Sequence, residues 1–155
     1  MRFQHLVLVV LLSVGSVNAQ SGSLSSAIGI SYSGINHNLR LHNTFGRFDL
    51  GVGPSVNYSK QKLPWSASPG VNTNFGYQLI DSGSIQTQVF VNYLLLPFRE
   101  ASIQEVNVGY TMFFRLSKKL NATNSLGFGG YSEKGEHYSI NGLSYCVNFG
   151  LSYRL

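Results

Sequence analysis

The sequence has 155 residues, with 11 Lys and Arg against 6 Asp and Glu, 13% aromatic residues, 17 Gly and one Cys. So few charges beside so many aromatic residues exclude a disordered tail and a charge-rich coiled coil. A single Cys excludes a disulfide-stapled mini-domain and a Cys-based zinc site. The net charge of +5 reflects scarce acids more than abundant bases, so we expect no nucleic-acid partner.

The amino end has the three parts of a secretory signal peptide. Arg2 supplies a positive charge, residues 6–12 form an apolar run, and small residues lead to Ala19. This run is shorter than the about 20 apolar residues that a spanning helix needs. We therefore expect residues 1–19 to be a signal peptide and residues 20–155 to form one domain outside the cytoplasm. An uncleaved anchor is the alternative.

After Gln20 apolar and polar residues alternate in eight runs. A period of two is typical of β-strands with unlike faces. The seventh run is the weakest, since Asn124 interrupts its alternation, and residues 60–70 are expected to be a loop because they contain two prolines. The predicted strands cover residues 24–32, 35–45, 48–58, 71–79, 85–95, 105–116, 120–129 and 142–155.

The two faces of these strands indicate where they lie. One face carries large apolar residues and seven of the nine Tyr, and the other carries Asn, Gln, Ser and Gly with hardly any Lys. A soluble barrel exposes a charged face, whereas a membrane barrel turns its apolar face to lipid and encloses a polar lumen. Eight tilted strands of about 9 to 11 residues suit the length of the chain. The sequence therefore predicts an all-β fold, an eight-stranded antiparallel up-and-down transmembrane β-barrel.

An even number of strands places both chain ends on the periplasmic side. The connections near residues 46, 82 and 118 then become periplasmic turns, and the outward connections are those near residues 34, 60–70, 97–102 and 132–137. The interior of an eight-stranded barrel is just wide enough for its own side chains. We therefore expect no open pore.

Over residues 22–155 this pattern resembles the small eight-stranded outer-membrane barrels of Gram-negative bacteria, the OmpA/OmpX-like class. The last strand ends in Tyr153, Arg154 and Leu155, which is similar to the terminal signature of that class, although its final residue is most often Phe. The resemblance implies a multi-pass barrel in the cell outer membrane, whose terminal strand is read by the barrel-assembly machinery. Such barrels serve as anchors, adhesins, receptors and lipid-modifying enzymes, so the fold leaves the function open.

Six ionisable residues have the parity of the lumen face: Arg40, His42, Asp49, Glu105, Arg115 and Arg154. Charges in a narrow lumen must be paired, because an isolated buried ion is very costly. We expect these side chains to form a network of salt bridges and hydrogen bonds that sets the register of the barrel. A proton or ion relay is the alternative, although Phe90 and Phe113 obstruct a continuous polar path.

An enzymatic alternative rests on Glu136, His137 and Ser139. A nucleophilic Ser needs a His base and an acid that orients the base. Some barrels of the resembled class carry such a constellation and act on lipid A, so a deacylase or acyltransferase is the alternative to a non-enzymatic barrel. No nucleophile elbow accompanies these residues. We expect no metal and no cofactor.

Basic and aromatic residues mark the two larger outward loops: Lys60, Lys62, Trp65 and Arg99. Such side chains bind lipopolysaccharide or a protein, or simply anchor the barrel at the membrane surface. We expect a structural or surface-interaction role, with outer-membrane lipid, lipopolysaccharide and an envelope protein as partners. A soluble, secreted lipocalin-like binder is the remaining alternative, but the Gly-x-Trp motif of lipocalins is missing from the first strand.

Overall fold

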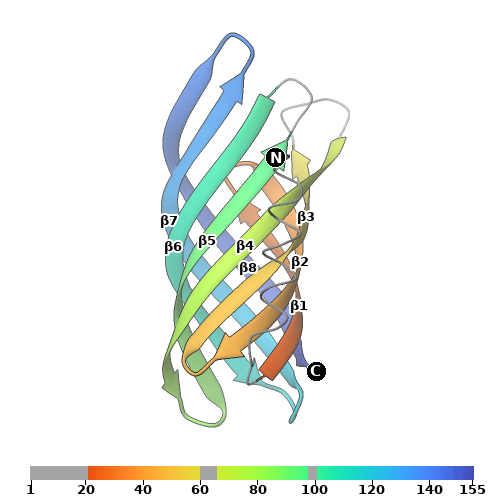
Figure 1. The fold of residues 1–155 in the computed structure, drawn as a ribbon, viewed down its shortest axis with the longest axis vertical. Helices are drawn as coiled ribbons and strands as arrows, with labels where there is room; N and C mark the ends of the chain where they lie inside the picture. Colours follow the sequence, from red (N-terminus) through yellow and green to blue (C-terminus); the bar gives the residue numbers. More distant parts are fainter. Residues whose placement is uncertain (1–20, 60–65, 98–100) are drawn as a thin grey trace, which may run out of the picture.

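Eight strands follow one another through the chain and wind around one axis (Figure 1). The computed structural model describes residues 21–59, 66–97 and 101–155. Each strand pairs antiparallel with its neighbour in sequence, and β1 also pairs with β8, so the predicted closed barrel is confirmed. Within the described residues no helix is long and apolar enough to cross a membrane. The strands are β1 (Ser21–Ser31), β2 (Gly34–Phe45), β3 (Phe48–Ser59), β4 (Ser66–Asp81), β5 (Ile85–Pro97), β6 (Ala101–Arg115), β7 (Leu120–Gly135) and β8 (Ser139–Arg154).

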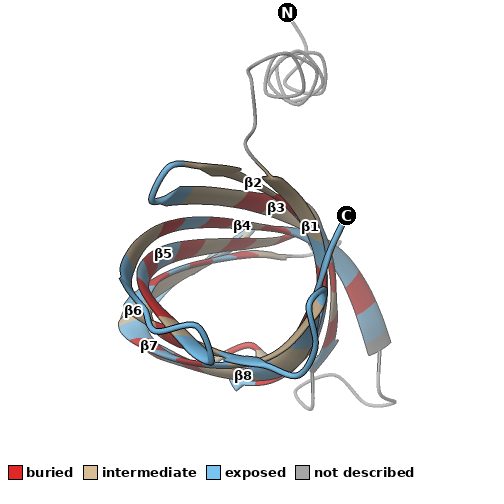
Figure 2. Cartoon of the chain, turned by 90° about the horizontal axis from the view of Figure 1, so that it is seen from below, coloured by how far each residue is buried: buried red, intermediate tan, exposed pale blue. Residues whose placement is uncertain are grey.

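Successive side chains alternate between the outside and the lumen. On β5, Val91 is 44% exposed whereas its neighbour Asn92 is 9% exposed. Every strand contributes exposed large apolar residues to the outer surface and buried polar residues to the lumen. Figure 2, a view along the barrel, shows burial changing from residue to residue along the strands. The distribution is the reverse of a soluble protein, whose apolar residues are mostly inside.

Several strands are longer than the alternation predicts. β4 begins at Ser66, so the expected loop over residues 60–70 was too long, and β7 continues to Gly135 and pairs with β6 throughout. Asn124 does not interrupt β7, because it keeps its place opposite Phe149 on β8. The added residues 66–70 and 130–135 are mostly small or polar, so the period of two no longer marks the strand there. Pro69 is tolerated because the ladder from β4 to β5 starts only at Val71, which leaves one side of Pro69 unpaired.

An irregularity in β4 changes the two faces locally. The register with β5 shifts between Gln78 and Ile80, as in a β-bulge. Leu79 and Ile80 are consequently both exposed, at 45% and 57%. Across the bulge Thr87 is buried, although the alternation assigns it to the outer face.

Glycines make room for the largest side chain inside the barrel. Phe90 lies opposite Gly109, and Gly109 lies opposite Gly127 on the next strand. A Cβ atom at Gly109 or Gly127 would stand 2.7 or 3.0 Å from the ring carbon Cζ of Phe90. The aromatic ring therefore needs neighbours without side chains, which is one reason for glycine within these strands.

The connections at the two ends differ in length. At one end the chain reverses at Gly46 and Gly83, both with positive φ (61° and 81°), and between β6 and β7. At the other end β8 pairs with β1 only up to Cys146, so residues 139–145 pair with β7 alone. The β7–β8 hairpin consequently rises above its neighbour β1 (Figure 1). The predicted turns near residues 46, 82 and 118 are confirmed and lie at the end that holds the carboxy terminus.

The outward face should tolerate charge far less than the lumen face. We expect Val108→Arg on β6, which would place a guanidinium in the centre of the exposed apolar surface, to cost about 2 to 4 kcal/mol in a lipid bilayer or to block assembly. The control Asn38→Ser exchanges one small polar lumen residue for another and should be mild. Urea titration of barrels folded into lipid vesicles measures both. Similar losses from the two variants would contradict the assignment of the faces.

Candidate functional site in the barrel lumen

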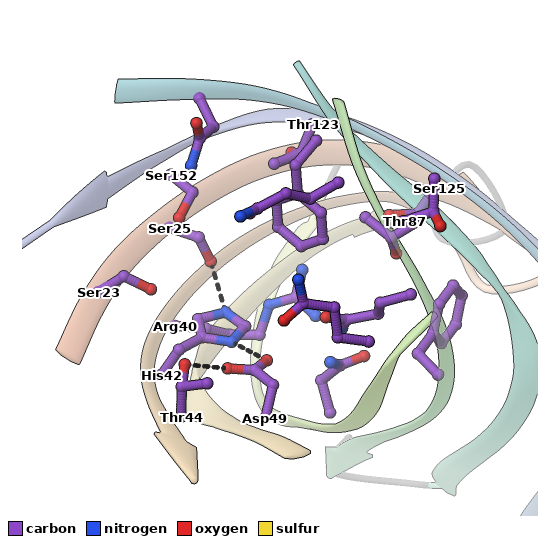
Figure 3. A pocket seen from close by; sticks show the side chains of 18 of the residues that line it. Ser23, Ser25, Arg40, His42, Thr44, Asp49, Thr87, Thr123, Ser125 and Ser152 are labelled. Carbon is purple, nitrogen blue, oxygen red and sulfur yellow. Dashed lines mark hydrogen bonds and ion pairs between the residues drawn. The ribbon is translucent and has the colours of Figure 1, made fainter. Parts of the chain in front are cut away.

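The lumen contains a cavity of about 270 Å³, which we call the vestibule. It is lined mainly by Ser, Thr, Asn and Gln, and it reaches from the turn residues Gly46 and Arg47 inward to Arg40 and Phe90. Arg154, near the carboxy terminus, also lines it. The vestibule therefore opens at the end of the barrel that carries the short turns. Figure 3 shows side chains of several strands converging on it.

The opposite half of the lumen is filled. Leu96, Glu105 and Asn57 are fully buried there, and Leu94 and Ile103 pack with Leu96 into a small apolar cluster. A small cavity beside Leu94 and Glu105 has a volume of about 10 Å³, which is no more than about one water molecule occupies. The larger cavity therefore lies in the half of the lumen that carries the short turns.

Glu105 is the centre of the filled half. Its carboxylate accepts hydrogen bonds from the hydroxyl groups of Ser31 (3.1 Å) and Ser144 (2.9 Å) and from the backbone N–H of Ser33 (3.0 Å). Within the described residues no Lys, Arg or His forms an ion pair with it. Neutral donors on β1, β8 and the β1–β2 turn therefore compensate this buried charge.

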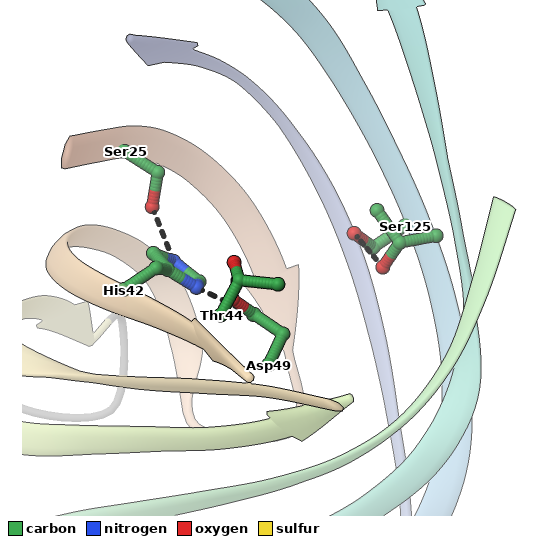
Figure 4. A network of polar contacts seen from close by, with 6 residues as sticks. Ser25, His42, Thr44, Asp49 and Ser125 are labelled. Carbon is green, nitrogen blue, oxygen red and sulfur yellow. Dashed lines mark hydrogen bonds and ion pairs between the residues drawn. The ribbon is translucent and has the colours of Figure 1, made fainter. Parts of the chain in front are cut away.

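The vestibule holds a chain of three side chains on three strands (Figure 4). The Nδ1 atom of His42 lies 2.7 Å from Oδ2 of Asp49, and its Nε2 atom lies 2.8 Å from Oγ of Ser25. A carboxylate only accepts, so Nδ1 carries a proton, and in the neutral imidazole Nε2 is then the acceptor for the hydroxyl group of Ser25. Thr44 donates a second hydrogen bond to Asp49 (3.4 Å). The arrangement fixes the tautomer and the orientation of the imidazole ring.

The local sequence explains how this chain forms. His42 and Asp49 are diagonal neighbours next to the short turn between β2 and β3, since Asp49 lies opposite Thr44 and Gly51 lies opposite His42. A Cβ atom at Gly51 would stand 2.6 Å from the imidazole ring, so glycine makes the space for His42. Ser25 comes from β1, diagonally across the ladder from His42.

Arg40 lines the vestibule next to this chain. It stands directly opposite Ser25 in the β1–β2 ladder. Its buried Nε atom has no hydrogen-bond partner, and no described acid lies within ion-pair distance of Arg40. A buried N–H donor without an acceptor is unusual, because such groups normally find a partner.

The structure does not bring the six expected lumen charges together in one network. His42 and Asp49 form a pair, Glu105 is held by neutral donors, and Arg40 has no acid partner. Arg115 is exposed at the end of β6, and Arg154 is exposed at the mouth of the vestibule. Both arginines are exposed because they lie near strand ends, although their parity is that of the lumen face, and of the two only Arg154 lines the vestibule.

Three further candidate residues lie outside the lumen. Glu136, His137 and Ser139 are exposed on the β7–β8 hairpin, and no hydrogen bond joins any two of them. Lys60, Lys62, Trp65 and Arg99 fall outside the described residues. In the described ranges no three His, Cys, Asp or Glu side chains gather as a metal site.

Asp81 marks the rim of the vestibule, at the β4–β5 turn and outside the apolar belt. The backbone N–H of Gly83 (3.0 Å) and the side-chain amide of Gln86 (2.8 Å) donate to its carboxylate. These hydrogen bonds hold the pKa of Asp81 below its ordinary value, with the Gly83 bond contributing most. Both acids of the vestibule, Asp49 and Asp81, are therefore engaged by other donors than its arginines.

Comparison with known proteins shows similarity in fold. No protein-family model matches the chain, and no curated protein matches it in sequence. A de novo designed transmembrane β-barrel is 11% identical with a TM-score of 0.61, over 87% of this chain and 95% of that one. The β-barrel domain of Pseudomonas aeruginosa OprF is 8% identical (TM-score 0.58, 87% and 97%), and Neisserial surface protein A is 7% identical (TM-score 0.51, 87% and 95%). The chain thus has the fold of small eight-stranded transmembrane barrels.

Removing the carboxylate of Glu105 should destabilise the filled half of the lumen. We expect Glu105→Ala to destabilise the folded barrel by about 1 to 3 kcal/mol, because the donors of Ser31, Ser33 and Ser144 lose their acceptor. Glu105→Gln keeps an acceptor oxygen and should cost less. Glu136→Ala, on the exposed hairpin, should stay within about 0.5 kcal/mol. Equilibrium unfolding in urea distinguishes these outcomes, and equal stability of Glu105→Ala and the wild type would contradict the assigned role.

Proposed function

We propose that this protein is an integral outer-membrane barrel with a structural or surface-interaction role and no open pore. The observation that carries the proposal is the exposed apolar surface that runs over all eight strands around a polar, buried lumen. Water does not favour such a surface, whereas the hydrocarbon of a bilayer does. A closed ladder also leaves no backbone group of the paired residues exposed to lipid.

The interior argues against the soluble lipocalin-like alternative. A soluble barrel that carries an apolar ligand needs an apolar interior, and here Asn, Ser, Thr and Gln dominate the buried residues. The described buried apolar residues are few: Ala27, Phe90, Leu94, Leu96, Ile103 and Cys146. Nothing in this interior favours the binding of an apolar molecule.

A closed lumen supports a role without solute diffusion. The fully buried residues of the outer half, Leu96, Glu105 and Asn57 among them, support a lumen without a continuous water path beyond Phe90. Moving them would break the hydrogen bonds of Glu105 and expose its charge, which is costly. The geometry favours a lumen whose outer half is closed by the side chains of the folded barrel itself.

The proposed partners follow from the surfaces. Outer-membrane lipid covers the apolar belt, and lipopolysaccharide meets its outer rim. The β7–β8 hairpin stands above β1 and exposes Tyr138, Ile140 and Leu143, the last at 89%, which suits contact with an envelope protein. The barrel-assembly machinery would read β8, where Phe149, Leu151 and Tyr153 alternate outward up to the carboxy terminus.

The membrane location can be tested on cells that express the full chain. We expect the protein in the outer-membrane fraction, with an electrophoretic mobility that changes when the sample is boiled in detergent, because a closed barrel resists detergent at room temperature. Val108→Arg serves as the assembly-deficient control. A soluble product whose mobility does not depend on heating would overturn the proposal.

The absence of a pore can be tested separately by electrical recording. The purified barrel, inserted into planar lipid bilayers, should give no stable conductance steps, because the outer half of the lumen is filled. A diffusion porin inserted in the same way is the positive control. Regular, reproducible channel openings by the wild-type barrel would contradict the closed lumen while leaving the membrane location intact.

A further inference from the structure

The chain of Ser25, His42 and Asp49 has a more specific geometry than is required to satisfy polar groups in the lumen. Oγ of Ser25 meets Nε2 of His42 at 2.8 Å, and Asp49 meets the other ring nitrogen at 2.7 Å. This is the atom order in which an acid orients a histidine base and the base activates a serine hydroxyl. We propose that Ser25 is the nucleophile of an ester-hydrolysing site in the vestibule, with His42 as the base and Asp49 as the positioning residue.

The lumen offers an internal comparison. Thr111 and Ser125 also face the vestibule, and their hydroxyl groups satisfy each other at 2.9 Å without a histidine (Figure 4). A hydroxyl in this barrel is therefore easily satisfied by another hydroxyl. At Ser25 the partner is a base whose second nitrogen is held by a carboxylate, and that carboxylate is held in turn by Thr44.

The site is rigid and accessible from one side. Its three side chains come from β1, β2 and β3, whose ladder fixes their spacing. Ser25, His42 and Asp49 all line the vestibule, whose volume of about 270 Å³ lies at the lower limit of ligand pockets. It admits a small acyl group and not a long lipid chain. The open end faces the side of the short turns, so the substrate would arrive from the periplasm.

The charged side chains of the vestibule indicate the substrate class. Arg40, Arg47 and Arg154 line the vestibule, and its two acids, Asp49 and Asp81, are engaged by His42, Thr44 and the β4–β5 turn. Arg40 stands opposite Ser25, and its Nε donor has no partner. A small ester with a carboxylate or phosphate group is therefore the substrate class that fits, since guanidinium groups bind such anions well.

The reaction balances with residues of this chain and water alone. Ser25 Oγ attacks the ester carbonyl carbon while its proton passes to Nε2 of His42, and the guanidinium of Arg40 faces the negative charge that develops on the carbonyl oxygen. The C–O bond then breaks, and the alcohol leaves with the proton from His42. Water, deprotonated by His42, next attacks the acyl group on Ser25 and releases the carboxylic acid and free Ser25.

The first test is covalent labelling of the full barrel folded in detergent. Diisopropyl fluorophosphate should phosphorylate Ser25, with loss of fluoride, and peptide mass spectrometry locates the adduct. We expect the labelling rate to fall at least about 100-fold in His42→Gln and clearly in Asp49→Asn, and no adduct to form at this position in Ser25→Ala. The matched control is Ser26→Ala, at an exposed serine of β1 that bonds His37 outside the lumen, and it should label like the wild type. Every variant must first show the heat-dependent mobility of the folded barrel.

Two results would overturn the proposal. One is a folded barrel in which Ser25 stays unlabelled, and the other is labelling that His42→Gln does not slow. Neither result touches the proposed membrane location, which the mobility assay reports on the same samples.

The proposed preference for anionic esters can be tested separately. The 4-nitrophenyl monoester of succinate carries a carboxylate, and 4-nitrophenyl acetate does not. We expect the wild type to favour the anionic ester at least about 10-fold in kcat/KM, and Arg40→Gln to lose that preference. Equal rates for both esters in a barrel that labels at Ser25 would refute the anionic substrate.

Discussion

The structure depends on one constraint, which is that backbone N–H and C=O groups inside an apolar belt must find partners within the chain. A β-strand presents these groups to both sides, so an open sheet would leave two rows unpaired in hydrocarbon. The ladder between β1 and β8, from Ser23 opposite Arg154 to Ser31 opposite Cys146, removes both rows at once. Once the sheet is closed, each side chain in the belt faces either the lipid or the lumen. The alternation of apolar and polar residues in the sequence follows from these two environments.

Closure also sets how much space the lumen has, and the side chains divide it unevenly. The ring of Phe90 fits into the lumen only because Gly109 and Gly127, which lie next to it, have no side chains. Beyond it Glu105, held by Ser31, Ser33 and Ser144, joins three segments that are distant in sequence. On the other side small Ser and Thr residues leave the vestibule empty. One barrel thus combines a filled plug with a recess in which the reactive side chains gather.

The sequence could predict some of this site and not the rest. His42 and Asp49 were assigned to the lumen by parity, and the short turn after Phe45 already places them near each other. Ser25 has the same parity, but which residue of β2 it meets depends on the register of β1, which alternation does not encode. Arg115 and Arg154 show the opposite case, because parity does not reveal that a strand has left the barrel interior. The bulge at Gln78 and the extensions of β4 and β7 escaped prediction because neither changes a clear apolar pattern.

Alternation, aromatic content and chain length were sufficient to establish an all-β barrel of eight strands with an apolar exterior, because a period of two reports directly which face each residue occupies. The tertiary structure decided how the strands are staggered. That stagger joins Ser25 to His42, leaves Arg40 without an acid, and gives Glu105 three neutral donors in place of a cation. These are contacts between strands, and their distances depend on register and closure, which are properties of the whole barrel and not of any one segment.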